Sequence, residues 1–269
     1  MISLPNSDIQ TAHGSHAGES GKNNEDHHVL LFFRPEPDDG ERLTVGIIAD
    51  GIGGNRAGEV ASELAVKTLS EAIAQSEARD GRVLLESAMR YTARVVAEHA
   101  KSRLEYHGMG TTCAIALLLG RRLYTAYIGD SRVYLCQRGV IRQISVDHTW
   151  VQEAMEMKLL TLVEAKQHPN RHVVRRHLGG SPDVKADFRL CLADDETAEQ
   201  SEKNQGLRLG PGDTVLLCSD GLSDLVEREE IGEVLNRHDP QGAVDELIVI
   251  ARARGGHDNI TVVVMRLPG

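Results

Sequence analysis

Four aspartates of this chain stand where a short apolar run begins or ends. Asp50 ends the run VGIIAD, Asp130 ends YIGD, Asp220 ends LLCSD, and Asp258 precedes NITVVV. Taken singly, each is explained by ordinary turn chemistry, because Asp, Asn and Gly favour turns. As a set they indicate more, because carboxylates carried at strand ends can converge at one end of a fold.

Converging carboxylates repel one another unless a cation binds among them. The sequence has no Cys or His cluster at zinc-ligand spacing, and oxygen donors alone select Mg²⁺ or Mn²⁺ over zinc. Small residues beside the acids fit this chemistry, since glycine lets carbonyl groups and waters approach a metal closely. The pattern therefore predicts a site for divalent cations with oxygen ligands.

Two other motifs suggest different chemistry, but their surroundings do not fit it. The segment GIGGNRAGE is similar to a dinucleotide-binding glycine loop, but Arg56 occupies the position of the third glycine. Cys136 and Arg142 have the spacing of a cysteine-dependent phosphatase. That chemistry needs a thiolate facing backbone N–H groups at the start of a helix, whereas Cys136 lies within a predicted hairpin.

The composition indicates a large aliphatic core and excludes several kinds of partner. Of 269 residues, 41% are hydrophobic and only 3% aromatic, so Val, Leu, Ile and Ala must fill the interior. The net charge of −10 argues against nucleic acid and anionic membranes as partners, because such binding depends on Lys and Arg. The four cysteines are widely spaced and no apolar run approaches the ~20 residues of a membrane span, which predicts a cytoplasmic protein with reduced thiols.

Short apolar runs rich in β-branched residues predict strands, and apolar residues at helical spacing predict helices. The predicted strands are 27–33, 43–50, 111–119, 122–128, 132–137, 139–144, 184–192, 213–219 and 259–267. The predicted helices are 58–75, 82–104, 149–166 and 241–253. Strands and helices do not alternate strictly in this order, which favours antiparallel sheets with helices packed outside.

Nothing in the sequence resembles an internal repeat or a linker, so we expect one catalytic domain over residues 1–269. Residues 1–8 are expected to form a loose N-terminus. Segment 193–206 (ADDETAEQSEKNQG) is polar and acidic and is expected to be a surface loop.

Seven sequence blocks occur in the order found in metal-dependent protein phosphatases of type 2C, the bacterial branch especially. They are NNED (23–26), ADGIGGNRAGEVAS (49–62), GMGTTCAIALL (108–118), YIGDSRVYL (127–135), VDHTW (146–150), LLCSDGLSD (216–224) and GHDNITVVV (256–264). The resemblance covers nearly the whole chain, about residues 9–267. It implies an α+β fold, a four-layer α/β/β/α sandwich with two antiparallel sheets packed face to face and helix pairs outside.

The resemblance also implies a site for two Mn²⁺ or Mg²⁺ ions and a weaker third one. The implied ligands are Asp50 between two ions, the Gly51 carbonyl on the first, Asp220 and Asp258 on the second, Glu25 and Asp26 through metal-bound water, and Asp130 with Asp220 at the third ion. The implied supporting residues are Asn259, Asp224 and His148. For His148, a structural role in its loop and a role as proton donor to the leaving group are both open.

The implied reaction is hydrolysis of phosphoserine or phosphothreonine in proteins by water activated between two cations, without a phosphoenzyme. In that mechanism Asp26, Asp50, Asp220 and Asp258 are the catalytic acids, acting through metal-bound water. Phosphorylated proteins are the implied substrates, a bacterial Ser/Thr kinase is the enzyme opposed, and the chain is expected to be a monomer.

The chain departs from the family pattern at two positions. Gly21 stands where the family usually has a phosphate-binding Arg, which leaves the neighbouring Lys22 as the candidate cation. Ile52 stands where some members have a His, so the proton for the leaving group must come from elsewhere. Gly21 favours two alternatives: a weakly active regulatory binding module, or a phosphatase for a narrow partner such as an anti-sigma antagonist. Segment 146–180 corresponds to the variable flap beside the family's active site.

Overall fold

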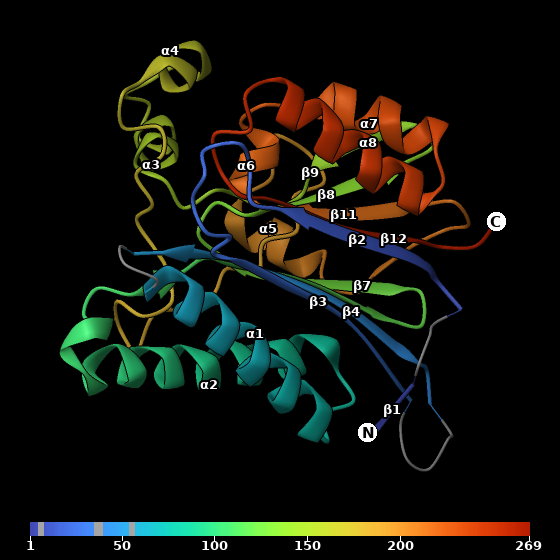
Figure 1. Ribbon diagram of the computed structural model, residues 1–269. Coiled ribbons are helices and arrows are strands. Elements are labelled where there is room, and N and C mark those ends of the chain that lie inside the picture. The colour runs from blue at the N-terminus through green and yellow to red at the C-terminus, as the bar shows by residue number, and fades with distance from the viewer. Residues whose placement is uncertain (5–7, 35–39, 54–56) are drawn as a thin grey trace.

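A computed structural model describes residues 1–4, 8–34, 40–53 and 57–269 of the chain (Figure 1). Two antiparallel sheets face each other across the middle of the molecule, and a pair of helices covers the outer face of each sheet. The predicted four-layer α/β/β/α sandwich is therefore confirmed.

The first sheet has the strand order β1-β3-β4-β6-β7-β10, with β5 paired to the end of β4. Its strands are β1 (Ile2–Ser3), β3 (Asp26–Arg34), β4 (Leu43–Ile52), β5 (Gly110–Thr111), β6 (Cys113–Leu119), β7 (Arg122–Ile128) and β10 (Leu207–Arg208). The second sheet has the order β2-β12-β11-β8-β9. Its strands are β2 (Gln10–His16), β8 (Arg132–Gln137), β9 (Val140–Gln143), β11 (Thr214–Cys218) and β12 (Ile260–Arg266).

Helices α1 (Ala57–Gln75) and α2 (Gly81–Ser102) pack on the first sheet, and α7 (Arg228–Arg237) and α8 (Pro240–Ala253) pack on the second (Figure 1). The 3₁₀ turn η1 (Leu104–Tyr106) follows α2, and the short helix α6 (Asp220–Ser223) begins directly after β11. Asp80 caps α2 by accepting a hydrogen bond from the Val83 N–H, and Asp239 caps α8 by accepting one from Gly242.

Alternate side chains of the central strands enter different cores, as the period of two in a strand requires. On β4, Val45 and Ile47 pack against α1 and α2, whereas Ile48 points into the layer between the sheets. Val263 of β12 meets that layer from the second sheet. The inter-sheet core is built mainly from Val, Leu, Ile and Ala, as the low aromatic content predicts.

The flap contains two short helices in place of the single predicted helix 149–166. Helix α3 (Trp150–Glu156) ends before Lys158, whose φ of 59° is left-handed and stops the helix. Thr161 is the N-cap of the next helix, α4 (Leu162–Gln167), and forms a reciprocal capping box with Glu164. In Figure 1 the two helices project from the body at one end of the sandwich, and both chain termini lie toward the opposite end.

The predicted strand 184–192 is wrong. The segment makes one isolated bridge, Asp187 to Tyr127, and the Asp187 carboxylate accepts a hydrogen bond from the Arg189 N–H, which turns the chain away from a strand path.

Two segments expected to be irregular contain regular elements. Segment 193–206 contains helix α5 (Ala198–Lys203), which is capped by a Thr197 capping box and has Ser201 as a buried residue. Within the terminus expected to be loose, Ile2 and Ser3 form β1 and pair with β3. Residues 5–7 lie outside the described part of the chain.

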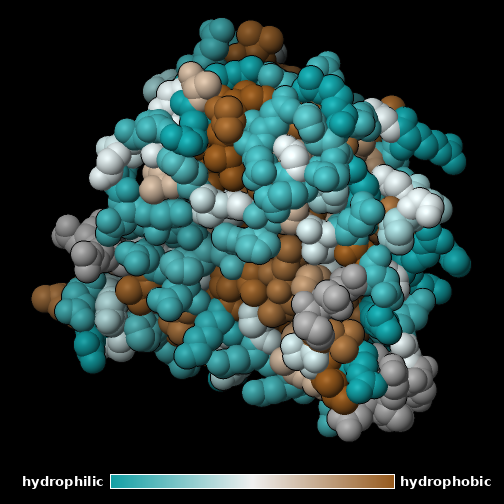
Figure 2. Space-filling model, turned by 45° about the vertical axis from the view of Figure 1, so that its right-hand side comes forward, coloured by the Kyte–Doolittle hydropathy of each residue, from teal (hydrophilic) through white to brown (hydrophobic). Residues whose placement is uncertain are grey.

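The strand β2 and the helix α7 were not predicted. The sequence of β2, QTAHGSH, contains no apolar run, and α7 is largely charged, with Ile231, Val234 and Leu235 as its buried apolar stripe. In the view of Figure 2 the surface is mostly hydrophilic, with hydrophobic residues confined to separate patches. Among the described residues, no helix combines the length and the apolar character needed to cross a bilayer.

Candidate active site

The first two predicted acids come from adjacent strands of the first sheet. Asp26 begins β3, Asp50 lies near the end of β4, and the antiparallel register pairs their Cα atoms directly. The carbonyl oxygen of Asp50 accepts hydrogen bonds from the Thr112 N–H at 2.8 Å and the Thr111 hydroxyl at 2.8 Å, and its N–H donates to Thr112 Oγ1 at 3.1 Å. These bonds fix the backbone of Asp50 so that its side chain is held at the end of the sheet.

The other two acids come from the second sheet. Asp220 follows β11 at the start of α6, and Asp258 lies just before β12, the strand next to β11. Ser219 connects the two sheets, because its hydroxyl donates to Asp26 Oδ2 at 2.7 Å. Its Oγ also accepts a hydrogen bond from the Thr261 N–H at 3.0 Å. The four acids thus reach one end of the sandwich from two separate sheets.

Asn259 holds the loop that carries Glu25. Its side-chain oxygen accepts a hydrogen bond from the Glu25 N–H at 2.8 Å, and its amide nitrogen donates to the carbonyl oxygens of Ala17 and Asn23, both at 3.1 Å. Asn259 therefore positions the backbone around NNED, which gives a physical basis for a supporting role.

Gly51 is required by a close approach of two chain segments. A Cβ atom there would collide with the carbonyl oxygen of Gly58 at the start of α1, and it would lie 2.8 Å from the Glu25 carbonyl oxygen. The Gly51 N–H donates to that Glu25 oxygen at 3.1 Å. Glycine therefore lets the end of β4, the Glu25 loop and α1 meet beside Asp50.

A pocket of about 450 Å³ lies where these segments meet. Its described lining contains one lysine, Lys22, against six carboxylates. The six are Glu25, Asp50, Asp130, Asp220, Asp224 and Asp258. Asp26 is not among the lining residues and lies behind Asp50, with 5% of its surface exposed.

Four of the buried carboxyl groups, those of Asp26, Asp50, Asp130 and Asp220, have raised pKa values, because burial disfavours their charged forms. Burial and the neighbouring Asp26 and Asp220 raise the pKa of Asp50 well above its usual range. Burial, followed by Asp130 and Asp224, does the same to the pKa of Asp220. Burial is also the main cause that raises the pKa of Asp26 to about 6 and of Asp130 to about 7. Lys22 is the one Lys or Arg among the described lining residues, so carboxylates are in excess there and a bound cation would compensate them.

Comparison with known proteins identifies the family. The family profile described as Protein phosphatase 2C matches residues 13–248. This chain belongs to the protein phosphatase 2C family. It is 34% identical over 224 residues to the serine/threonine phosphatase stp of Listeria monocytogenes, a match that covers 81% of this chain and 82% of the relative.

Solved structures of the phosphatase 2C family have the same fold. The structure of the Mycobacterium tuberculosis serine/threonine phosphatase PstP/Ppp superposes with a TM-score of 0.81 at 33% identity, covering 97% of this chain and 99% of the other. A catalytic-domain structure of PstP in complex with two manganese ions gives a TM-score of 0.79 at 31% identity, with coverage of 97% and 99%.

The acids of this phosphatase 2C member fit divalent cations on grounds internal to the chain. Asp26 Oδ1 and Asp220 Oδ1 are buried oxygens with no hydrogen-bond partner among the described residues. Buried polar atoms without a partner are rare and call for an unseen ligand or ion. The surrounding donors are carboxylate and carbonyl oxygens, which suit Mg²⁺ and Mn²⁺.

His148 lies outside the pocket lining and is 3% exposed. Its Nδ1 accepts a hydrogen bond from the Gly129 N–H at 3.0 Å, its own backbone N–H donates to the Gly129 carbonyl oxygen at 2.9 Å, and Nε2 lies 3.2 Å from Asp187 Oδ2. Of the two roles open for His148, the structural one agrees with this geometry, because the residue clamps the turn that carries Asp130.

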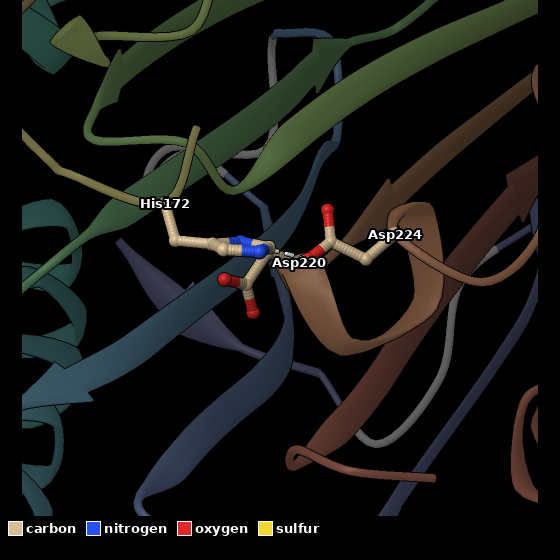
Figure 3. A group of neighbouring side chains, drawn as sticks. All are labelled: His172, Asp220 and Asp224. Carbon is tan, nitrogen blue, oxygen red and sulfur yellow. Dashed lines mark ion pairs between the residues drawn. The ribbon is translucent and has the colours of Figure 1, made fainter. Parts of the chain in front are cut away.

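Two histidines of the flap line the pocket and were not predicted. His172 Nδ1 lies 3.0 Å from Asp224 Oδ2, and Figure 3 shows His172 reaching toward Asp220 and Asp224 from the opposite side. One ligand atom from each of these three residues lies within 4.8 Å of the other two. His177 lines the pocket a few residues further on. The sequence signal available was the segment RHVVRRH in the flap, where histidines and arginines cluster.

The structure also locates the departures from the family pattern. Lys22 and Ile52 line the pocket, whereas Gly21 does not. Gly21 has a φ of +72°, and a Cβ atom added there would point into open space. A longer side chain at position 21 would therefore meet backbone strain rather than a steric clash.

Proposed function

We propose that this chain is a metal-dependent phosphatase that hydrolyses phosphoserine and phosphothreonine in proteins, acting as a single catalytic domain. The observation that carries the proposal is the convergence of Asp50, Asp220 and Asp258 from two sheets on one pocket whose described lining holds six carboxylates and one lysine. Membership of the phosphatase 2C family and the similarity to proteins named serine/threonine phosphatases support the substrate class.

The pocket has ligands for two Mn²⁺ or Mg²⁺ ions. Asp50 would lie between them, with the Gly51 carbonyl on one side and Asp220 and Asp258 on the other, while Glu25 and Asp26 would accept hydrogen bonds from bound water. Two such ions supply positive charge for the phosphate and lower the pKa of the attacking water. Asp130 and Asp220 would hold a third, weaker ion, and His172 and Asp224 stand close enough to support it.

Lys22 is the residue proposed to bind the substrate phosphate, because it is the lysine that lines the described pocket and Gly21 offers no side chain. An ammonium group makes a single point contact, whereas an arginine would bind phosphate bidentately. We therefore expect efficient turnover combined with weak binding of small substrates.

The proposed phosphatase function also indicates a cellular setting. The substrates are proteins phosphorylated by a bacterial Ser/Thr kinase, and the enzyme works in the cytoplasm as a monomer. The free state of its four cysteines, of which three are buried, agrees with a reducing compartment.

The decisive experiment is hydrolysis of p-nitrophenyl phosphate and of a phosphothreonine peptide with Mn²⁺, with Mg²⁺ or with EDTA. Activity with either metal and its loss in EDTA are expected, and activity that survives chelation would exclude the proposed mechanism. Asp195→Asn, at an exposed position far from the site in sequence, is a matched control for Asp→Asn changes in the pocket.

The glycine at position 21 favours a second candidate, a catalytically weak module that binds phosphoproteins, or a phosphatase restricted to one partner of the anti-sigma-antagonist type. Binding of phosphopeptide by folded protein without turnover under every metal condition would favour the binding module. Turnover of a single phosphoprotein, with none of peptides, would favour the restricted enzyme.

A further inference from the structure

The exposed apolar side chains of the described residues are concentrated in the flap. Ten large hydrophobic residues are exposed in the described structure, and half of them lie between positions 157 and 173. These five are Met157 (69% exposed), Leu159 (71%), Leu162 (64%), Val163 (68%) and Val173 (43%). Apolar groups gathered on one exposed element mark an interaction surface more often than scattered ones do.

The same segment is positively charged, although the protein as a whole is acidic. Residues 157–177 contain five Lys or Arg and one Glu, a formal charge of +4, in a chain of total charge −10, so that the remaining residues carry −14. Lys166 pairs with Glu227 and Arg175 with Glu153. The charged groups of Lys158, Arg171 and Arg176 form no ion pair with any other residue that the structure describes.

The unpaired arginines lie beside the catalytic pocket. Arg171 precedes His172 and Arg176 precedes His177, and both histidines line the pocket. The backbone here is anchored, because the Arg175 N–H donates to the His148 carbonyl oxygen at 2.7 Å and Leu178 bridges to Thr111. The backbone that carries these two exposed arginines is therefore held beside the pocket.

From these observations we propose that the flap surface formed by Met157, Leu159, Leu162, Val163, Arg171 and Arg176 binds the phosphoprotein substrate itself. The occupant is the segment flanking the phosphorylated residue. It carries acidic side chains within about four residues of the phosphate and an apolar side chain further along. This inference rests on the proposed phosphatase function and adds a sequence preference to it.

The reach of an extended peptide sets which flanking positions the proposal concerns. An extended peptide advances about 3.3 Å per residue, so side chains two to four positions from the phosphorylated residue lie about 7–13 Å along the chain. We expect carboxylates at these positions to meet Arg171 and Arg176, and an apolar side chain beyond them to meet the turn after α3 and helix α4. Opposite charges across a contact favour specificity and fast association.

The experiment measures binding and turnover of three fluorescent phosphothreonine peptides of equal length. One has acidic flanks and a distal Leu, one has neutral flanks and the same Leu, and one has acidic flanks with the Leu replaced by Ser. Binding is read by fluorescence anisotropy, first with the unaltered protein at low temperature without added metal and again with Mn²⁺. The expected result is about tenfold tighter binding of the acidic Leu peptide than of the neutral one at low salt, shrinking to about twofold at 300 mM NaCl.

Two double variants separate the charged and apolar parts. Arg171→Ser with Arg176→Ser should reduce the preference for acidic flanks to less than twofold. Leu162→Ser with Val163→Ser should abolish the advantage of Leu over Ser. Hydrolysis of p-nitrophenyl phosphate should stay within twofold of the unaltered protein in both. Arg90→Ser with Arg94→Ser, on the exposed face of α2, removes the same charge elsewhere and should leave all preferences unchanged.

Four outcomes would overturn the proposal. The first two are equal binding of acidic and neutral peptides and loss of the preference in the α2 control variant. The third is self-association that disappears with Leu162→Ser and Val163→Ser, which would make a second copy the occupant. The fourth is tighter binding of single-stranded DNA than of the acidic peptide. A protein that shows the peptide preference but hydrolyses no phosphate retains the docking surface and refutes the proposed function, so the two failures are distinguishable.

Discussion

The buried carboxylate of Asp187 and the buried carboxylates of the pocket have opposite electrostatic surroundings. Asp187, 8% exposed, lies close to His148 Nε2 and accepts hydrogen bonds from the Arg189 guanidinium at 2.6 and 2.8 Å. Burial alone would raise its pKa, but these hydrogen bonds hold the pKa well below the usual range. In the pocket, the pKa values of Asp50 and Asp220 are raised instead, because burial and neighbouring carboxylates act in the same direction.

The difference distinguishes a buried carboxylate that is neutralised by other residues of the fold, Asp187, from buried carboxylates whose charge a bound ligand would neutralise. Asp187 pairs with Arg189 and lies close to His148 in the folded protein, so its charge contributes to the stability of the fold. Asp50 and Asp220 have no Lys or Arg partner among the described residues, so their burial costs stability, and a bound cation would offset that cost. Changes at the two sites should therefore have opposite consequences.

The largest effect is expected for Asp220→Asn. Removal of one proposed ligand should lower kcat for p-nitrophenyl phosphate by at least about a thousandfold. In EDTA the variant should also unfold at a higher temperature than the unaltered protein, with about 1 kcal/mol gained from relieved repulsion. Asp195→Asn should change neither quantity. Normal turnover by Asp220→Asn would refute the ligand assignment.

Asp187→Asn should act in the opposite sense. It leaves His148 and Arg189 with a weakened buried partner, so the free energy of unfolding should fall by about 2–4 kcal/mol in urea titrations. Asp183→Asn, an exposed change nearby, should stay within about 0.5 kcal/mol. Equal stability of the two variants would show that the Asp187 cluster does not stabilise the fold.

The contribution of Asp187 should depend on pH with a definite sign. Its pKa is lowered in the folded state, so the unfolded chain binds a proton first as the pH falls. The stabilisation is therefore complete above about pH 5 and declines as the pH drops below the usual Asp pKa, about 3.9. The stability difference between the unaltered protein and Asp187→Asn should be smaller at pH 3 than at pH 7. A difference that grows on acidification would contradict the sign.

Lys22→Ala tests the source of positive charge that the chain itself brings to the pocket. KM for p-nitrophenyl phosphate should rise about tenfold, consistent with the loss of one charge-assisted contact to phosphate, while kcat changes less than threefold. Lys185→Ala, outside the pocket lining, is the control. A large fall in kcat at unchanged KM would assign Lys22 to the chemical step instead.

A smaller effect is expected for Gly21→Arg. An arginine fork beside the pocket should lower KM on a phosphopeptide about threefold. The left-handed backbone at this position should cost about 1 kcal/mol of stability. If thermal unfolding reports the cost while KM stays unchanged, the new side chain does not reach the phosphate.

Much of this arrangement could be predicted from the sequence, because local patterns encode it. The acids lie beside small residues, and short continuous apolar runs place them at strand ends. The position of His172 beside Asp224 could not be predicted, since they are 52 positions apart in the sequence and no spacing rule links a flap residue to the end of helix α6. The strand predicted at 184–192 failed because Asp187 forms side-chain bonds that override an apolar pattern.

The hydrogen bond from Ser219 to Asp26 joins two sheets that otherwise meet mainly through apolar side chains. Cations held between Asp50 of one sheet and Asp220 of the other would cross-link the two sheets at this end of the sandwich. Metal occupancy would then be detectable without an activity measurement, as slower amide hydrogen exchange at the adjoining ends of β3, β4 and β11. The opposite ends of those strands, near the chain termini, would exchange at the same rate with or without metal.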